Sequence, residues 1–182
     1  MPTATGVGVR GIRPAVFWWR SAAVTAAYFL WGRGPTRAAA QAIPRTHVLI
    51  ISGASGEPRF ADLFHADAMA LRDVAISRFG IPDSLVVYLA EDPARDPRAV
   101  GGRSTREGIT QGVERIADRA APGDAIFVLL LGHGSSDGDV SRFNVPGADV
   151  TDADFARLLG RFANQTVAFV NTTSASGDFV KK

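Results

Sequence analysis

The chain has 182 residues, of which 46% are hydrophobic, so it carries enough apolar residues for one packed domain and is not a disordered chain. Its formal net charge is +2, but residues 1–45 hold six arginines and no acidic residue, which leaves 14 basic and 18 acidic residues, a net charge of −4, for the remainder. This balance does not indicate a nucleic-acid partner, and the absence of cysteine excludes disulfides, zinc–thiolate sites and a cysteine nucleophile in the chain.

Residues 1–42 follow the order of segments found in secretory signal peptides. An arginine-bearing, glycine-rich stretch comes first, residues 21–32 form an uncharged run, and an Ala-x-Ala pattern ends at Ala42. The uncharged run is shorter than the ~20 residues of a membrane span. We therefore expect cleavage after Ala42, with Ile43 as the first residue of an exported protein in the periplasm or the medium.

Two other interpretations of residues 1–42 stay open. An uncleaved leader would be an N-terminal membrane anchor. A disordered or mistranslated upstream extension is favoured by Arg33 and Arg37, which lie between the uncharged run and the cleavage site. That interpretation would leave the protein in the cytoplasm.

Four apolar runs predict the strands of a sheet. Residues 46–52 and 84–90 are the first two, and the other two open the segments 124–135 and 166–177. The two central runs are too continuous for strands with one face in water. They indicate a sheet that is covered on both sides.

Three segments with helical spacing separate these strands. Ser104 with Glu107 and Thr151 with Asp154 predict capping boxes at the start of the second and third helices. The apolar stripes of the three helices are Phe64, Ala68, Leu71, Ala75 and Phe79; Ile109, Val113, Ile116, Ala117 and Ala120; and Phe155, Leu158, Leu159 and Phe162.

The alternation of strands and helices predicts an α/β fold over residues 43–182, with a parallel, doubly wound sheet and helices on both faces. Residues 91–103 and the segment after His133 are expected to be loops. Few residues follow the fourth strand, and we expect a further flanking element. The domain is therefore expected to be incomplete at its carboxyl end, and residues 43–182 alone to be marginally stable or aggregation-prone.

Several motifs favour a structural interpretation over a chemical one. Residues 53–56 (GASG) lack the third glycine of a dinucleotide-binding loop, which indicates a tight turn and no cofactor. The segment that begins at residue 137 lacks the glycine and glutamate of a calcium loop, so a solvated loop without a metal is predicted. His47 in a strand and His65 on a helix are expected to be structural. Residues 172–177 hold only the second glycine of the α/β-hydrolase nucleophile motif.

Small polar residues follow the two central strands. Gly132, His133 and Gly134 end one strand, and a Ser-Ala-Ser-Gly stretch that begins at Ser174 follows the other. In open α/β sheets, residues just past the carboxyl ends of neighbouring strands meet in the crevice where ligands bind. We therefore expect His133 and Ser174 to face each other.

This pair of motifs resembles the caspase-like fold, and within it the legumain-like peptidases and their bacterial relatives. Residues 130–135 match the His-Gly at the end of an apolar strand, and residues 171–177 match the Ala-Cys-x-Ser-Gly type of nucleophile motif, with Ser174 in the place of cysteine. The resemblance implies a peptidase that acts on peptides or proteins, with His133 as the general base, the backbone N–H of Gly134 at the oxyanion and position 174 as the nucleophile.

Ser174 is the departure from the family that decides activity. A thiol, with a reference pKa of about 8.5, is partly ionised at neutral pH and is intrinsically nucleophilic, whereas an alcohol needs a well-oriented base. The sequence indicates no residue that orients His133. Two hypotheses remain: a peptidase-family domain with weak or no activity, and a non-catalytic domain of the same fold that binds peptides or partner proteins in the crevice.

Overall fold

A computed structural model describes residues 43–181, except for the side chains of Asp178, Val180 and Lys181. The expected signal peptide and the alternative N-terminal anchor lie outside the described residues. None of the helices between residues 43 and 181 combines the length and the hydropathy that a membrane crossing requires.

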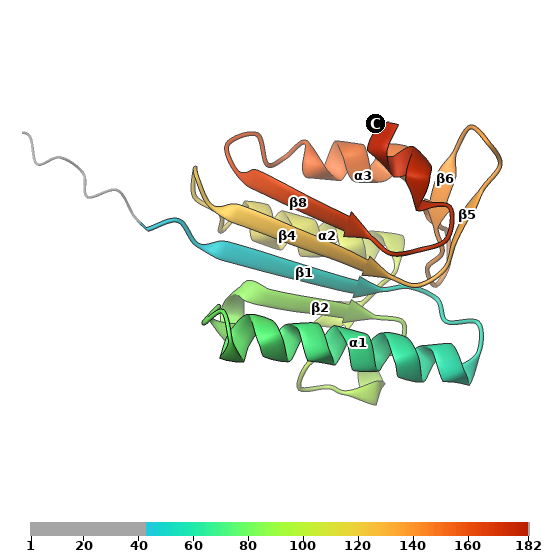
Figure 1. Ribbon diagram of the computed structural model, residues 1–182, viewed down its shortest axis with the longest axis horizontal. Coiled ribbons are helices and arrows are strands. Elements are labelled where there is room, and N and C mark those ends of the chain that lie inside the picture. Colours follow the sequence, from blue (N-terminus) through green and yellow to red (C-terminus); the bar gives the residue numbers. More distant parts are fainter. Residues whose placement is uncertain (1–42, 182) are drawn as a thin grey trace, which may run out of the picture. The chain divides into compact units, whose positions relative to one another are not determined.

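A five-stranded parallel sheet forms the centre of the fold (Figure 1). Every neighbouring pair of strands is parallel. The spatial order is β3 (Gly102–Arg103), β2 (Val86–Ala90), β1 (Thr46–Ser52), β4 (Ala125–Leu131) and β8 (Thr166–Asn171). The chain starts in the middle, builds towards one edge and then crosses to the other, which is the doubly wound order. The predicted α/β class is confirmed, and β3 is an additional short strand in the segment expected to be a loop.

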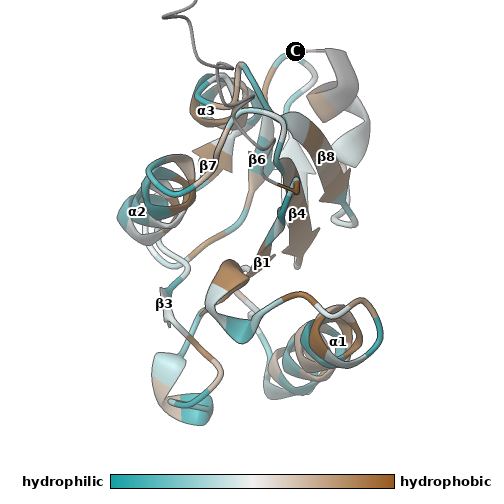
Figure 2. Ribbon diagram, turned by 90° about the vertical axis from the view of Figure 1, so that its left-hand side faces the viewer, coloured by the Kyte–Doolittle hydropathy of each residue, from teal (hydrophilic) through white to brown (hydrophobic). Residues whose placement is uncertain are grey.

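Helices cover both faces of this sheet (Figure 2). Helix α1 (Pro58–Ser77) lies on one face, and α2 (Arg106–Ala117) and α3 (Asp152–Leu159) lie on the other. Successive side chains of β1 alternate between the two faces. Val48 and Ile50 join the apolar cluster under α1, whereas Leu49 and Ile51 join the one under α2 and α3. This two-sided burial explains why the runs in β1 and β4 are continuously apolar.

The start of α2 differs from the prediction by one residue. Thr105, not Ser104, is the N-cap, and its Oγ1 accepts a hydrogen bond from the N–H of Gly108 at 3.1 Å. Ser104 is buried and its N–H donates to the carbonyl of Ala90 at 2.9 Å. The predicted capping box of Ser104 and Glu107 is wrong, because residue 104 still belongs to the ladder between β3 and β2.

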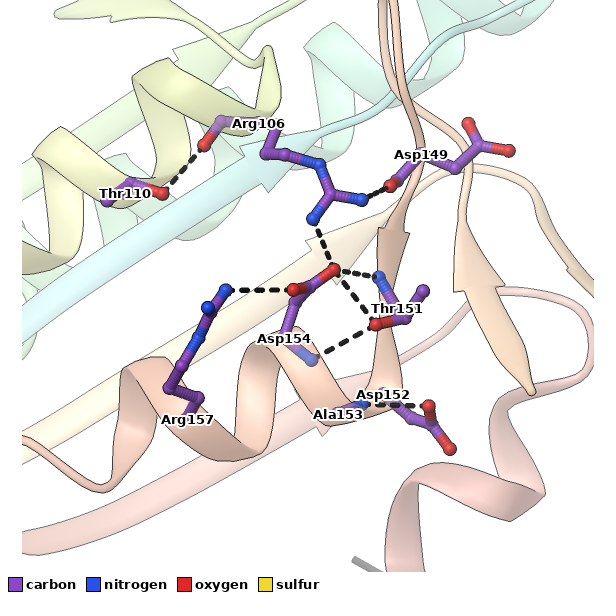
Figure 3. A network of polar contacts seen from close by, with 8 residues as sticks. All are labelled: Arg106, Thr110, Asp149, Thr151, Asp152, Ala153, Asp154 and Arg157. Atoms are coloured by element: carbon purple, nitrogen blue, oxygen red, sulfur yellow. Dashed lines mark hydrogen bonds and ion pairs between the residues drawn. The ribbon is translucent and has the colours of Figure 1, made fainter. Parts of the chain in front are cut away.

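The capping box at α3 is confirmed (Figure 3). The Oγ1 of Thr151 accepts from the N–H of Asp154, and the Asp154 carboxylate accepts from the N–H of Thr151. Arg106 pairs with Asp154 and donates to the carbonyl of Asp149, which ties α2 to α3. Burial alone would raise the pKa of Asp154, but the Thr151 hydrogen bonds and the Arg106 guanidinium together lower it.

A second, antiparallel sheet replaces the loop expected after His133. It consists of β5 (Gly134–Ser136), β6 (Ser141–Phe143) and β7 (Val150–Thr151) in that order. The loop prediction was wrong. No sequence pattern indicated these strands, because each has only two or three residues and none forms an apolar run. The turn between β5 and β6 is exposed, and Asp137 in it accepts from the N–H groups of Asp139 and Val140, as in a solvated turn.

Strand β8 is less covered than β1 and β4. Its Val167 and Phe169 pack towards α3, whereas Thr166, Ala168 and Val170 are exposed on the other face. The predicted stripe of α1 also ends early: Phe79 is 70% exposed, because the helix stops at Ser77. Three short 3-10 helices complete the described chain: η1 (Asp83–Leu85), η2 (Pro93–Arg95) and η3 (Ser176–Lys181).

Candidate functional site

The two predicted site motifs leave neighbouring strands at the same edge of the sheet. Strands β4 and β8 pair in parallel over their whole common length, with Leu130 opposite Asn171. The segments that follow Leu131 and Asn171 therefore emerge side by side, at the carboxyl edge where α/β sheets bind ligands. This edge is the candidate site.

Gly134 lies against the backbone of Ser174. A Cβ atom added to Gly134 would lie 2.3 Å from the carbonyl oxygen of Ser174, 2.7 Å from Oγ1 of Thr173 and 3.0 Å from the carbonyl oxygen of Arg142. Only glycine allows the backbone to approach this closely. The structure thus brings two of the three predicted site residues into contact.

His133, the third predicted residue, is held by aromatic rings of α1. Its imidazole meets Phe60 at a centroid distance of 4.8 Å and Phe64 at 5.4 Å, both edge-on. Phe60 and Phe64 are one helical turn apart, so they present their rings on the same side of α1. The carbonyl of His133 accepts from the N–H of Asn144 at 3.0 Å. Ring and backbone of His133 are therefore both fixed, by residues that the sequence did not indicate as site residues.

Ser174 is exposed and follows the buried Thr173. Within residues 43–181, neither its hydroxyl nor the imidazole of His133 forms a hydrogen bond, and the two are not bonded to each other. Catalytic hydrogen bonds are often long in ligand-free enzymes, so this geometry does not decide the pairing. The next residue, Ala175, has a φ of 57°, a left-handed conformation that costs an alanine about 1–2 kcal/mol. Backbone strain of this kind gathers at functional sites.

Polar side chains fix the loop around Ser174. The N–H and Oγ1 of Thr173 both lie within hydrogen-bonding distance of Oδ1 of Asn171, at 3.0 and 2.8 Å. Oγ of Ser141 on β6 donates to the carbonyl of Ala175 at 3.1 Å. Two buried polar atoms at this edge, Nδ2 of Asn171 and Oδ1 of Asn144, have no hydrogen-bond partner among the described residues. Unsatisfied buried groups are uncommon in folded proteins, which sets this edge of the sheet apart.

The glycine-containing turn after β1 closes the site on the other side. A Cβ on Gly53 would lie 2.3 Å from the carbonyl oxygen of Asn144. The N–H of Gly53 donates to Leu131 and that of Ala54 to Asn144, and the N–H of Ser55 donates to Glu91. These three amides already have protein acceptors, as in the predicted tight turn.

A small cavity of about 40 Å³ lies beside the site, between α1 and the ends of β1 and β2. It contains a chain of hydrogen-bonding groups in which the Tyr88 hydroxyl lies 3.2 Å from Oγ of Ser52 and 3.3 Å from Nδ1 of His65. Burial raises the pKa of Tyr88, against the lowering effect of the Ser52 hydrogen bond. His65 therefore lies near the carboxyl edge of the sheet, which its position in the sequence did not indicate. Its hydrogen-bonding contact there is with the Tyr88 hydroxyl.

His47 lies at the opposite end of the sheet from the site. It is 1% exposed, and its Nε2 lies 3.1 Å from Oδ2 of Asp124. The expectation that His47 is structural agrees with this placement. In the part of the chain that the structure describes, no three His, Cys, Asp or Glu residues are grouped so that they could hold a metal ion.

Neither a scan against models of protein families nor a search of curated proteins gave a match for this chain. The class of protein therefore rests on the fold and the geometry of the site. It is an α/β domain with a parallel sheet flanked by helices, in which a His-Gly and a Ser-Ala-Ser-Gly segment meet at the carboxyl edge.

Proposed function

We propose that residues 43–181 form a caspase-like domain of the legumain-related peptidases, with His133, Gly134 and position 174 as its reaction centre and Ser174 as the cause of weak or absent hydrolysis. The observation that carries the proposal is the contact of Gly134 with the backbone of Ser174, past the ends of two adjacent parallel strands. A base, an oxyanion donor and a nucleophile for acyl transfer have to converge in this way.

The orientation of the Gly134 amide supports its role at the oxyanion. The hydrogen bond from Asn144 to the carbonyl of His133 makes 133–144 a hydrogen-bonded pair of the antiparallel ladder. The next pair, Gly134 with Phe143, is then the non-hydrogen-bonded one, because the two kinds alternate. The N–H of Gly134 therefore points away from β6, and in this proposal it donates to the oxygen of a bound carbonyl.

In this proposal the imidazole of His133 removes the proton of the attacking group at position 174, and Phe60 and Phe64 hold the ring in place of a hydrogen-bonding partner. Aromatic edges fix the plane of a ring but do not select its tautomer, as a carboxylate would. An alcohol depends on such a base far more than a thiol does. The combination of Ser174 with this environment explains why we expect little hydrolysis.

The second candidate function is a non-catalytic domain that binds peptides or partner proteins at the same edge. It is favoured by Ser174 itself, because an alcohol is a weaker nucleophile than the cysteine thiol of the family. Both candidates share the site and differ in the reactivity of position 174.

The test is to convert Ser174 to cysteine in the full chain. Because the protein has no cysteine, Ser174→Cys introduces its only thiol, and iodoacetamide alkylation reports on that residue alone. We expect the variant to be alkylated at lower pH than an ordinary thiol and to hydrolyse a fluorogenic casein that the parent leaves nearly intact. Adding His133→Ala should abolish the hydrolysis and return alkylation to the ordinary pH range.

Ser84→Cys is the matched control, since residue 84 is exposed in η1 and distant in sequence from both motifs. Its alkylation should follow the pH dependence of a free thiol, with or without His133. The proposed centre is wrong if the Ser174 parent cleaves casein as fast as the cysteine variant, or if the variant's hydrolysis persists without His133.

A further inference from the structure

A second pocket lies on the opposite face of the sheet from the ring of His133. Its volume is about 280 Å³, close to the lower end of ligand pockets, which begin at about 300 Å³. It is lined by one acidic and five apolar residues: Asp152, Phe155, Ala156, Leu159, Phe169 and Phe179. We call it the Asp152 pocket.

Asp152 is a buried carboxylate with an incomplete set of partners. It is 3% exposed; Oδ1 accepts from the N–H of Ala153 at 2.8 Å, and Oδ2 has no donor among the described residues. Figure 3 shows its carboxylate directed away from the network around Asp154. Asp154 engages both Arg106 and Arg157, so neither arginine is left for Asp152.

A buried carboxylate without a counter-charge is costly, so its presence in a pocket needs an explanation. Asp152 is the first residue of α3, and the amino end of a helix favours a negative charge there. Among the side chains that the structure describes, none of those lining the pocket is basic. An anionic ligand is therefore repelled, and a neutral apolar ligand would leave the carboxylate unpaired.

The remaining walls suit a cation on an apolar chain. The ring of Phe155 lies 5.3 Å from that of Phe169 and 5.9 Å from that of Phe179, centroid to centroid. Aromatic faces attract ammonium groups, and the attraction grows when water is excluded. The alkyl part of such a ligand would lie on the phenyl rings while its charged end pairs with Asp152.

We propose that the Asp152 pocket binds an alkylammonium group, such as the side chain of a lysine in a partner peptide. The proposal is independent of the peptidase-type centre, because the pocket belongs to the α3 side of the sheet and the His133 ring to the α1 side. A negative result for alkylammonium binding would not contradict the peptidase-type centre, and the reverse also holds.

The experiment titrates the full 182-residue chain with n-butylammonium chloride, followed by amide NMR and by thermal unfolding. We expect saturable shifts at Ala153, Phe155 and Phe169 and a melting temperature that rises with ligand concentration. Equal concentrations of 1-butanol, the neutral isostere, and of sodium chloride should produce neither. The absence of saturation up to tens of millimolar butylammonium would overturn the proposal.

Two variants separate the charge from the walls. In Asp152→Asn the side-chain oxygen can still accept from the N–H of Ala153, but the affinity for butylammonium should fall by at least about tenfold. Asp67→Asn replaces an exposed acid on α1 and should bind butylammonium as the parent does. Ala156→Trp, at an exposed position that lines the pocket, should block binding while leaving the carboxylate intact. Unchanged affinity in Asp152→Asn, or in a folded Ala156→Trp, would refute the site.

Discussion

The amino and carboxyl ends of β1 and β4 are built from different chemistry, although the two strands run side by side for seven residues. At the amino end, the Asp124 carboxylate accepts from the backbone N–H of Arg45 at 2.8 Å and from that of Ala121 at 2.9 Å. The Arg45 guanidinium and His47 complete its surroundings. Every oxygen of this buried group has a donor.

At the carboxyl end, the segments that surround the same two strands hold unsatisfied and strained groups. Asn144 and Asn171 each bury a polar atom that has no partner among the described residues, and Ala175 has a left-handed backbone. Gly53 and Gly134 permit backbone contacts that no other residue allows. The buried carboxylate at the amino end is fully satisfied, whereas the carboxyl end carries unsatisfied and strained groups, a pattern that is common at functional sites.

The largest effect should come from adding one methyl group at the carboxyl end. Gly134→Ala places a Cβ against backbone oxygen, which cannot move aside as a flexible side chain can. We expect the free energy of unfolding to fall by about 3 kcal/mol, measured by urea denaturation. Gly160→Ala is the control: residue 160 has a helical φ of −58°, and its Cβ would come no closer than 3.4 Å to another atom, so a change within about 0.5 kcal/mol is expected. Equal stability of the two variants would contradict the close approach of Gly134 to backbone oxygen.

The second prediction concerns the amino end. Asp124→Asn puts an amide NH₂ where the carboxylate accepts from N–H groups, and we expect a loss of about 2 kcal/mol at pH 7 by the same measurement. Asp67→Asn, exposed on α1, should change little.

The Asp124 effect should depend on pH in one direction. The N–H of Arg45 contributes most to lowering the pKa of Asp124, burial opposes this, and the remaining donors lower it further. A carboxyl group with a lowered folded-state pKa stabilises the protein fully above its unfolded pKa of about 3.9 and loses that contribution as the pH falls through the lowered value. The difference between the parent and Asp124→Asn should therefore narrow at pH 3. A difference that widens in acid would contradict this assignment.

The smallest effect is expected in the turn between β5 and β6, which is exposed to solvent. The hydrogen bond from Arg142 is the main cause that lowers the pKa of Asp137 to about 2. An NMR titration of the Asp137 carboxyl should have its midpoint near that value, and Arg142→Gln should move the midpoint up towards the ordinary range. The melting temperature at pH 7 should fall only slightly in Asp137→Asn, because solvent screens an exposed ion pair. An unchanged midpoint in Arg142→Gln would rule out the pairing.

Elements with local or strongly periodic signals could be predicted from the amino-acid sequence alone. Continuous apolar runs predicted β1 and β4, since a strand buried on both faces must be apolar at every position. The three-residue spacing of Thr151 and Asp154 predicted the start of α3, because a capping box needs only neighbours along the chain. The carboxyl-edge position of His133 and Ser174 also followed, since parallel strands end on the same side.

The tertiary structure decided what depends on contacts between distant segments. Thr105 is the N-cap in place of Ser104, because the backbone N–H of Ser104 donates to Ala90 in the ladder between β3 and β2. The strands β5, β6 and β7 contain no apolar run from which they could have been predicted. The contacts of Phe60 and Phe64 with His133, about 70 residues further along the chain, follow from where α1 packs. Local spacing cannot encode such contacts, because each depends on how whole elements pack. The sequence therefore indicated the residues of the proposed centre but not the residues that hold His133 in place.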